Sequence, residues 1–127
     1  MFIDYYSTLN VDHKANSGVI KRAYRRQAIK WHPDKNPGKD TASEMQQVNE
    51  AYLILGDPDA RERYDKEYTL FKQKFSGNEE TDSSYDIQDD ILNDWINKAR
   101  RQSIDLAKQT IQDIVGLTKE STSAAFD

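Results

Sequence analysis

Apolar residues recur at helical spacing in four segments within the first 75 positions. The first segment is short and covers residues 4–11, the second runs from 17 to 31, the third starts near 41, and the fourth follows Pro58. The apolar positions of the second segment are Ile20, Ala23, Tyr24, Ala28 and Trp31. Because an α-helix has about 3.6 residues per turn, these intervals place the apolar side chains on one face and predict an amphipathic helix.

Residues that start and end helices separate these segments. Asn16 is a candidate N-cap of the second helix, and Pro33 ends it because proline lacks an N–H and disfavours helical geometry in the preceding residue. Residues 41–44, TASE, match a capping box for the third helix, which Gly56 closes, and Asp57 is the expected cap of the fourth. No strand-like alternation is found. The sequence therefore predicts an all-α fold, an antiparallel helical hairpin with short flanking helices.

The chain beyond the fourth segment has a different pattern. Residues 76–86, SGNEETDSSYD, are rich in glycine, serine and acids, and we predict a linker there. Residues 87–117 again have an apolar side at helical spacing, which begins with Leu92, Trp95, Ile96 and Ala99. We therefore divide the chain into a helical domain at 1–75, the linker, and an amphipathic helical extension at 87–127 that ends in a disordered tail.

Charge is also unevenly distributed. Residues 1–75 carry 13 lysines and arginines against 11 acids, whereas the remaining residues carry 5 against 11, so that the chain has a net charge of -4. From His13 to Pro33 there is no acidic residue. The cations of this stretch that fill the second helix are Lys21, Arg22, Arg25, Arg26 and Lys30. We expect a positive helix face that suits an acidic partner surface.

Composition excludes several classes of protein. Hydrophobic residues make up 36% of the chain and cysteine is absent, so we expect a small core with neither disulfides nor thiolate metal sites. With two histidines, no metal site is expected. No signal peptide or run of about 20 apolar residues is found, which predicts a cytoplasmic protein without membrane contact. Nucleophile elbows, phosphate loops and catalytic carboxylate pairs are also missing, so neither enzymatic activity nor a cofactor is expected.

Residues 3–67 resemble the J domain of DnaJ-type co-chaperones. The resemblance rests on three stretches in family order and spacing, DYYSTLNV, IKRAYRRQAIKWHPDKN and VNEAYLILGDPDARERYD. It implies an antiparallel helical hairpin with a His-Pro-Asp loop, which stimulates ATP hydrolysis by a DnaK-class (heat-shock 70 type) chaperone and has no catalysis of its own. The chain departs from the family pattern at Asn10, Gln27, Trp31, Met45 and Gly56, and it lacks the Gly/Phe-rich segment and cysteine-rich zinc module of full DnaJ.

The resemblance also implies roles for individual residues. Pro33 would stiffen the turn after the basic helix, Asp34 would pair with an arginine of the chaperone, and His32 would help to fix the loop. The other positions implied to contact the partner, to steer it or to support the loop are Lys21, Arg22, Tyr24, Arg25, Arg26, Lys30 and Asn36.

Two alternative hypotheses belong to other functional classes. A nucleic-acid-binding module that reads with its second helix is disfavoured by the negative net charge and by the acidic C-terminal part. The second alternative is a scaffold or targeting protein, in which residues 87–117 dock a client or scaffold or self-associate. The same segment could fold back on the helical domain, where its acidic start would meet the basic second helix and limit access of the chaperone.

Overall fold

The computed structural model describes residues 2–74 and 85–106, and within these ranges the chain is helical and contains no strand. The predicted all-α fold is confirmed. The elements are α1 (Tyr5–Leu9), α2 (Ser17–Trp31), the 3₁₀ turn η1 (Pro33–Lys35), α3 (Ala42–Leu55), α4 (Pro58–Lys74) and α5 (Asp90–Leu106). No helix in the described ranges is long and apolar enough to cross a bilayer.

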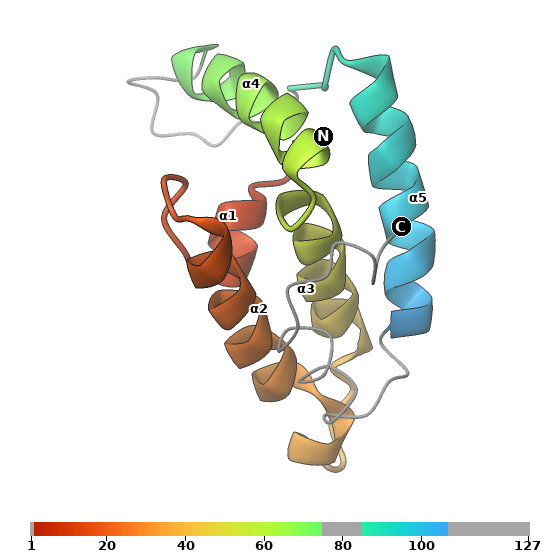
Figure 1. Ribbon diagram of the computed structural model, residues 1–127. Coiled ribbons are helices and arrows are strands. Elements are labelled where there is room, and N and C mark those ends of the chain that lie inside the picture. The colour runs from red at the N-terminus through yellow and green to blue at the C-terminus, as the bar shows by residue number, and fades with distance from the viewer. Residues whose placement is uncertain (1, 75–84, 107–127) are drawn as a thin grey trace.

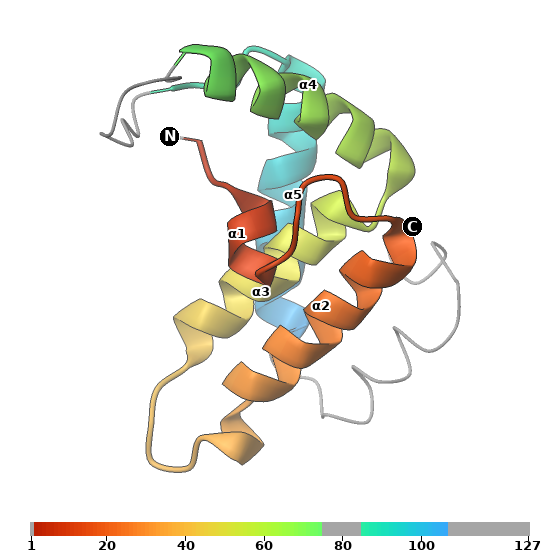
Figure 2. The same ribbon diagram turned by 90° about the vertical axis from the view of Figure 1, so that its left-hand side faces the viewer.

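Helix α3 lies at the centre of the molecule. It packs against α1, α2, α4 and α5, and in Figure 1 it stands between α2 on one side and α5 on the other. Figure 2, in which the molecule is rotated about its vertical axis, shows α2 and α3 as an antiparallel pair joined by the η1 loop, with α5 behind α3. Every residue from Val48 to Leu55 is buried, as expected for a helix that has neighbours on all sides.

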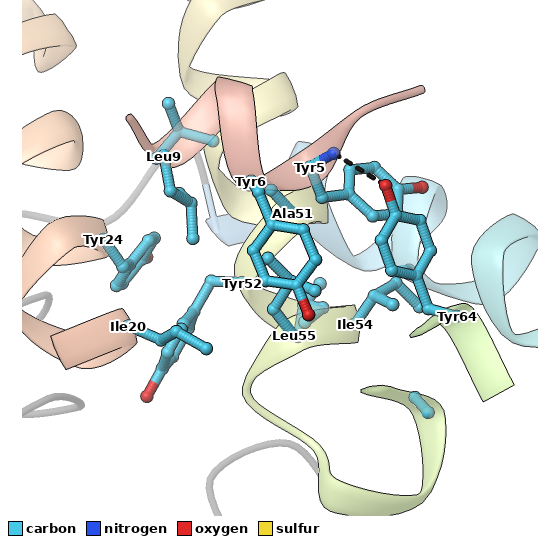
Figure 3. Close-up of a cluster of buried hydrophobic side chains, with 14 of the residues drawn as sticks. Tyr5, Tyr6, Leu9, Ile20, Tyr24, Ala51, Tyr52, Ile54, Leu55 and Tyr64 are labelled. Carbon is cyan, nitrogen blue, oxygen red and sulfur yellow. Dashed lines mark hydrogen bonds between the residues drawn. The ribbon is translucent and has the colours of Figure 1, made fainter. Parts of the chain in front are cut away.

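Tyrosine rings form much of the core where α1, α2, α3 and α4 meet (Figure 3). The rings of Tyr24 and Tyr52 stack with their centroids 4.2 Å apart. The hydroxyl of Tyr64 donates to the carbonyl of Ile3 at 2.6 Å and accepts the N–H of Tyr5 at 2.9 Å. Burial of Tyr5, Tyr6, Tyr24 and Tyr64 is tolerated because each of these four hydroxyls has a hydrogen-bond partner.

Two of the three predicted helix caps are confirmed. The Asn16 side chain accepts the N–H of Val19 at 2.9 Å, and Asp57 accepts the N–H of Ala60 at 3.2 Å. The predicted capping box at the start of α3 is wrong, because the side chain of Thr41 makes no cap hydrogen bond. Its hydroxyl instead donates to the carbonyl of Trp31 at 2.6 Å, across the loop that joins α2 to α3.

Three of the departures from the J-domain pattern have different structural outcomes. Asn10 ends α1 in the left-handed region, with φ 55, a conformation that asparagine tolerates better than most residues. Met45 is 1% exposed and takes a core position, whereas Gln27 is half-buried on α2. Of these three departures only Met45 changes what fills the core, and α2 and α3 still form the antiparallel hairpin.

The C-terminal extension begins to pack before its helix starts. Tyr85, which lies within the predicted linker, is 6% exposed, and its ring meets those of Phe2 and Phe71 edge-on at 5.8 and 5.7 Å. Residues 76–84 of the predicted linker and everything after Leu106, including the whole predicted tail, lie outside the described residues. The predicted linker therefore contributes at least one side chain, Tyr85, to the core.

Helix α5 folds back onto the helical domain, but not onto the helix that we expected. Its buried side chains Leu92, Ile96 and Ala99 join the core, and the helix packs on α3 and α4. Asp89, just before α5, pairs with Arg63 of α4 at 2.9 Å rather than with a cation of α2. The hypothesis that the acidic start of this segment covers the basic helix is therefore contradicted.

Candidate functional site

The loop between α2 and α3 begins where α2 is forced to end. His32 adopts an extended conformation, with ψ 142, as expected for a residue that precedes proline. Pro33 then opens the single turn η1, and Gly38, with φ 79, supplies the left-handed conformation that the return toward α3 requires. The His-Pro-Asp sequence thus forms the first part of a compact loop at the end of the helical hairpin, at the bottom of Figure 1.

His32 is turned inward and shapes the turn. It is 4% exposed, and its Nδ1 accepts the backbone N–H of Asp34 at 3.1 Å. A neutral imidazole that accepts at Nδ1 carries its proton on Nε2, so this hydrogen bond selects one tautomer. The ring therefore holds the backbone of the residue whose carboxylate is predicted to meet the partner.

Asn36 and Thr41 fasten the loop to the end of α2. The Nδ2 amide of Asn36 donates to the carbonyls of Lys30 and His32, both at 2.8 Å, and Thr41 supplies the bond to Trp31 described above. Carbonyls in the last turn of a helix lack partners within the helix, so donors from the loop satisfy them. Asn36 was predicted to support the loop. Thr41 was missed, because a threonine before a helix also fits a capping role.

Asp34 projects from this turn into solvent. Its side chain is 70% exposed, and its Oδ2 lies 3.6 Å from Nδ1 of His32. Pro33 beside it is also exposed. The backbone is held by polar side chains before and after the carboxylate, so the charge is presented in a restricted position and remains accessible to a partner.

The basic stripe of α2 runs toward the same end of the molecule. We define it as the five cations Lys21, Arg22, Arg25, Arg26 and Lys30, of which Lys21 is half-buried and the other four are exposed. Spacing of four residues places Arg22, Arg26 and Lys30 along one line and Lys21 and Arg25 along the adjacent line. Among residues 2–74 and 85–106, no carboxylate forms an ion pair with any of the five.

Tyr24 does not lie on this surface. It is 1% exposed, and its hydroxyl donates to Oδ1 of Asn49 on α3 at 2.8 Å. Burial is the largest cause that raises the pKa of Tyr24, so the hydroxyl remains a donor. The resemblance implied that Tyr24 contacts the partner or supports the loop, and its burial favours a supporting role over direct contact. Its helical position faces inward, and it supports the basic stripe by joining α2 to α3.

Most of the predicted site residues are exposed. Over the part of the chain that the structure describes, no group of three histidine, aspartate or glutamate side chains is placed to hold a metal ion. The functional features that come together are an exposed carboxylate, a loop held by hydrogen bonds, and a stripe of cations about 12 Å long from Arg22 to Lys30, by the helical rise per residue.

Comparisons with known proteins identify the family of the N-terminal half of the chain. The family model described as "DnaJ domain" matches residues 4–65. Over 64 residues the chain is 52% identical to the chaperone protein DnaJ of Chlorobium chlorochromatii, an alignment that covers 50% of this chain and 16% of that protein. Over 66 residues it is 48% identical to human DnaJ homolog subfamily B member 3, covering 50% of this chain and 46% of that protein.

The matched region has clear bounds. The chain spans less than half the length of both of these relatives, and the family match ends before α5 begins. It contains α1, α2, the His-Pro-Asp loop, α3 and the first part of α4. Residues 4–65 of this chain are therefore a DnaJ domain, the J domain that the sequence predicted.

Proposed function

We propose that this chain is a co-chaperone whose J domain binds a DnaK-class heat-shock chaperone and stimulates its ATP hydrolysis, thereby assisting protein folding. The observation that carries the proposal is the carboxylate of Asp34, 70% exposed on a turn held by His32, Asn36 and Thr41. Nothing in such a surface performs chemistry on a substrate. It acts by binding to the partner that does.

The charges suggest an order of events. The basic stripe attracts an acidic surface of the chaperone over a distance of about one Debye length, roughly 8–10 Å at physiological salt, and orients the approach. Asp34 then pairs with an arginine of the chaperone, and this pair becomes strong once water is excluded around it. Because the loop is already held in place, little conformational freedom is lost when the pair forms.

Single-turnover ATP hydrolysis by a DnaK-class chaperone tests this proposal. The chain is expected to accelerate hydrolysis, and Asp34→Asn is expected to abolish most of the acceleration, since the amide has the shape of the carboxylate without its charge. Glu62→Gln is the matched control, because its carboxylate on α4 is 71% exposed and the same charge is removed. Undiminished stimulation by Asp34→Asn would reject the proposed role of the loop.

A scaffold or targeting role for the extension is a second candidate. It is favoured by Ile91 and Ile104 of α5, which are 47% and 50% exposed and are apolar side chains available to a partner. A test by deletion of α5 would be confounded, because the helix contributes Leu92 and Ile96 to the core. Surface substitutions on α5 that leave chaperone stimulation intact but abolish capture of a client or scaffold would support this role.

A further inference from the structure

A groove lies directly beside the His-Pro-Asp loop, where the start of α3 meets the end of α5. Its volume is about 390 Å³. Apolar parts of its lining come from Pro33 of the loop, Ala42 and Met45 of α3 and Ile104 of α5, and Lys39 and Asp40 stand among the polar lining residues. The groove therefore joins the loop of the J domain to a helix that lies outside the matched family region.

The position of Ile104 in this groove is held by its neighbours. Ser103, the preceding residue, is fully buried, and its carbonyl accepts a hydrogen bond from Nδ2 of Asn49 at 3.4 Å. Ile104 itself remains 50% exposed. A large apolar side chain is thus kept partly in water at a defined place, on a helix end that packing on α3 has already positioned.

We infer that Ile104 is a specificity-determining residue for the chaperone, because it extends the chaperone-binding surface from the J domain onto α5 and receives an apolar side chain of the DnaK-class partner in this groove. The inference rests on the proposed function. Its argument is continuity: Pro33 lines the groove and immediately precedes Asp34, so a chaperone surface that pairs with Asp34 lies against the groove.

This arrangement would let the chain distinguish among chaperones. An apolar side chain that enters the groove removes its own surface and that of Ile104 from water, which stabilises the complex. A chaperone with a polar side chain at that point would lose this contribution while keeping the charge pairs at the loop and at the basic stripe. Specificity would then come from α5, and the common activity from the J domain.

Binding of the full-length chain to the ATP-bound chaperone tests the inference. Ile104→Asp is expected to raise Kd about tenfold, because a charge replaces a buried apolar contact. Ile91→Asp is the matched control on the same helix, equally exposed and about 20 Å away by the helical rise, and is expected to leave Kd unchanged. Ile104→Leu is expected to retain binding. Equal Kd values for the three variants and the unmodified chain would overturn the inference.

A second measurement identifies the occupant of the groove directly. Because the chain has no cysteine, Ile104→Cys provides a single attachment site for a photoreactive benzophenone. Crosslinking to the chaperone in the presence of ATP would support the inference. Crosslinking only to a second copy of the chain, or only within the same chain to residues 107–127, would overturn it, and this readout does not depend on how well the Ile104→Asp variant folds.

ATPase stimulation by Asp34→Asn, measured beside the binding of Ile104→Asp, separates the two proposals. If Asp34→Asn loses stimulation while Ile104→Asp binds normally, the groove is not a chaperone contact and the proposed function stands. If Asp34→Asn retains stimulation, the proposed function fails whatever Ile104 does. Loss of stimulation in the first variant together with weaker binding in the second would support both.

Discussion

Helices α2 and α5 flank α3 on opposite sides and use their charges in opposite ways (Figure 1). The stripe of cations on α2 faces solvent, and within the described residues no carboxylate pairs with it. Arg100 on α5 instead pairs with Glu50 of α3 at 3.0 Å. The cations of the α2 stripe are thus available to a partner, whereas the cation Arg100 holds α5 against α3 within the molecule.

Burial explains this difference. Glu50 is 5% exposed, and a buried carboxylate is strongly destabilising unless charged or hydrogen-bonding groups surround it. Besides Arg100, it accepts a hydrogen bond from the hydroxyl of Tyr5 at 2.6 Å. Burial, and then the nearby Glu50, raises the pKa of Tyr5, so this hydroxyl keeps its proton. Exposed cations such as Arg22 and Arg26 contribute little to stability and can be changed without loss of the fold.

The largest expected effect comes from reversing the charge of α2. Arg22→Glu combined with Arg26→Glu should slow association with a DnaK-class chaperone about 10- to 100-fold at low salt, because electrostatic steering is reversed. The free energy of unfolding should hardly change. Stopped-flow binding over a salt series measures the association rate, and the difference from the unmodified chain should shrink as salt is raised.

The matched control for that experiment lies on α5. Lys98→Glu combined with Arg101→Glu makes the same change in net charge at two exposed positions of the other helix. This variant should associate at close to the original rate. If both double variants were slowed equally, the net charge of the chain rather than the basic stripe of α2 would govern the encounter.

The second effect concerns stability. Arg100→Met should lower the free energy of unfolding by about 2 kcal/mol, less than for a fully buried pair because the Arg100 side chain is 44% exposed. Denaturant unfolding measures this change. Adding Glu50→Gln should restore much of the loss, since the uncompensated charge is then gone. A coupling energy below about 0.5 kcal/mol in this double-mutant cycle would contradict the assigned role of the pair.

A smaller effect is expected at the loop. Thr41→Val keeps the shape of the side chain but removes the hydroxyl that donates to Trp31, which should destabilise the fold by about 1 kcal/mol. The loop should also be less ordered, so half-maximal ATPase stimulation should require a severalfold higher concentration of the chain. Thr41→Ser should behave like the original residue. A valine variant with unaltered stimulation would show that this hydrogen bond does not position Asp34.

The smallest effect depends on pH. The N–H of Leu92 and then the guanidinium of Arg63 hold the pKa of Asp89 below its ordinary value of 3.8. A lowered folded-state pKa stabilises the protein above pH 3.8, and this contribution is lost as pH falls through the lowered value. Asp89→Asn keeps a capping side chain but removes the charge, so it should cost less than about 1 kcal/mol at neutral pH.

Thermal unfolding from neutral pH down to about pH 2 checks this last prediction. The unmodified chain and Asp89→Asn should differ at neutral pH and converge at the acidic end, where the carboxylate of Asp89 is protonated. A difference that stayed constant over the whole range would mean that the variant acts through the shape of the cap and not through the ion pair with Arg63.

Sequence reasoning succeeded where short-range rules decide the outcome. The end of α2 at Pro33, the caps at Asn16 and Asp57, and the helical hairpin all follow from spacing and from properties of neighbouring residues. It failed at Thr41, because a hydroxyl before a helix can either cap that helix or donate to a distant carbonyl. At Tyr24, helical spacing correctly placed the ring on the apolar face of α2.

By itself, the sequence determined the helices, the basic stripe, the His-Pro-Asp loop and the J-domain family, because helical periodicity, proline geometry and motif spacing are local properties of the chain. Only the tertiary structure decided that α5 lies on α3, that Arg100 neutralises Glu50, and that Ile104 and Pro33 line the same groove. These outcomes join residues far apart in the chain, such as Arg100 and Glu50, which are 50 positions apart. Which partner such a residue meets depends on the burial of apolar surface over the whole fold, which no local pattern specifies.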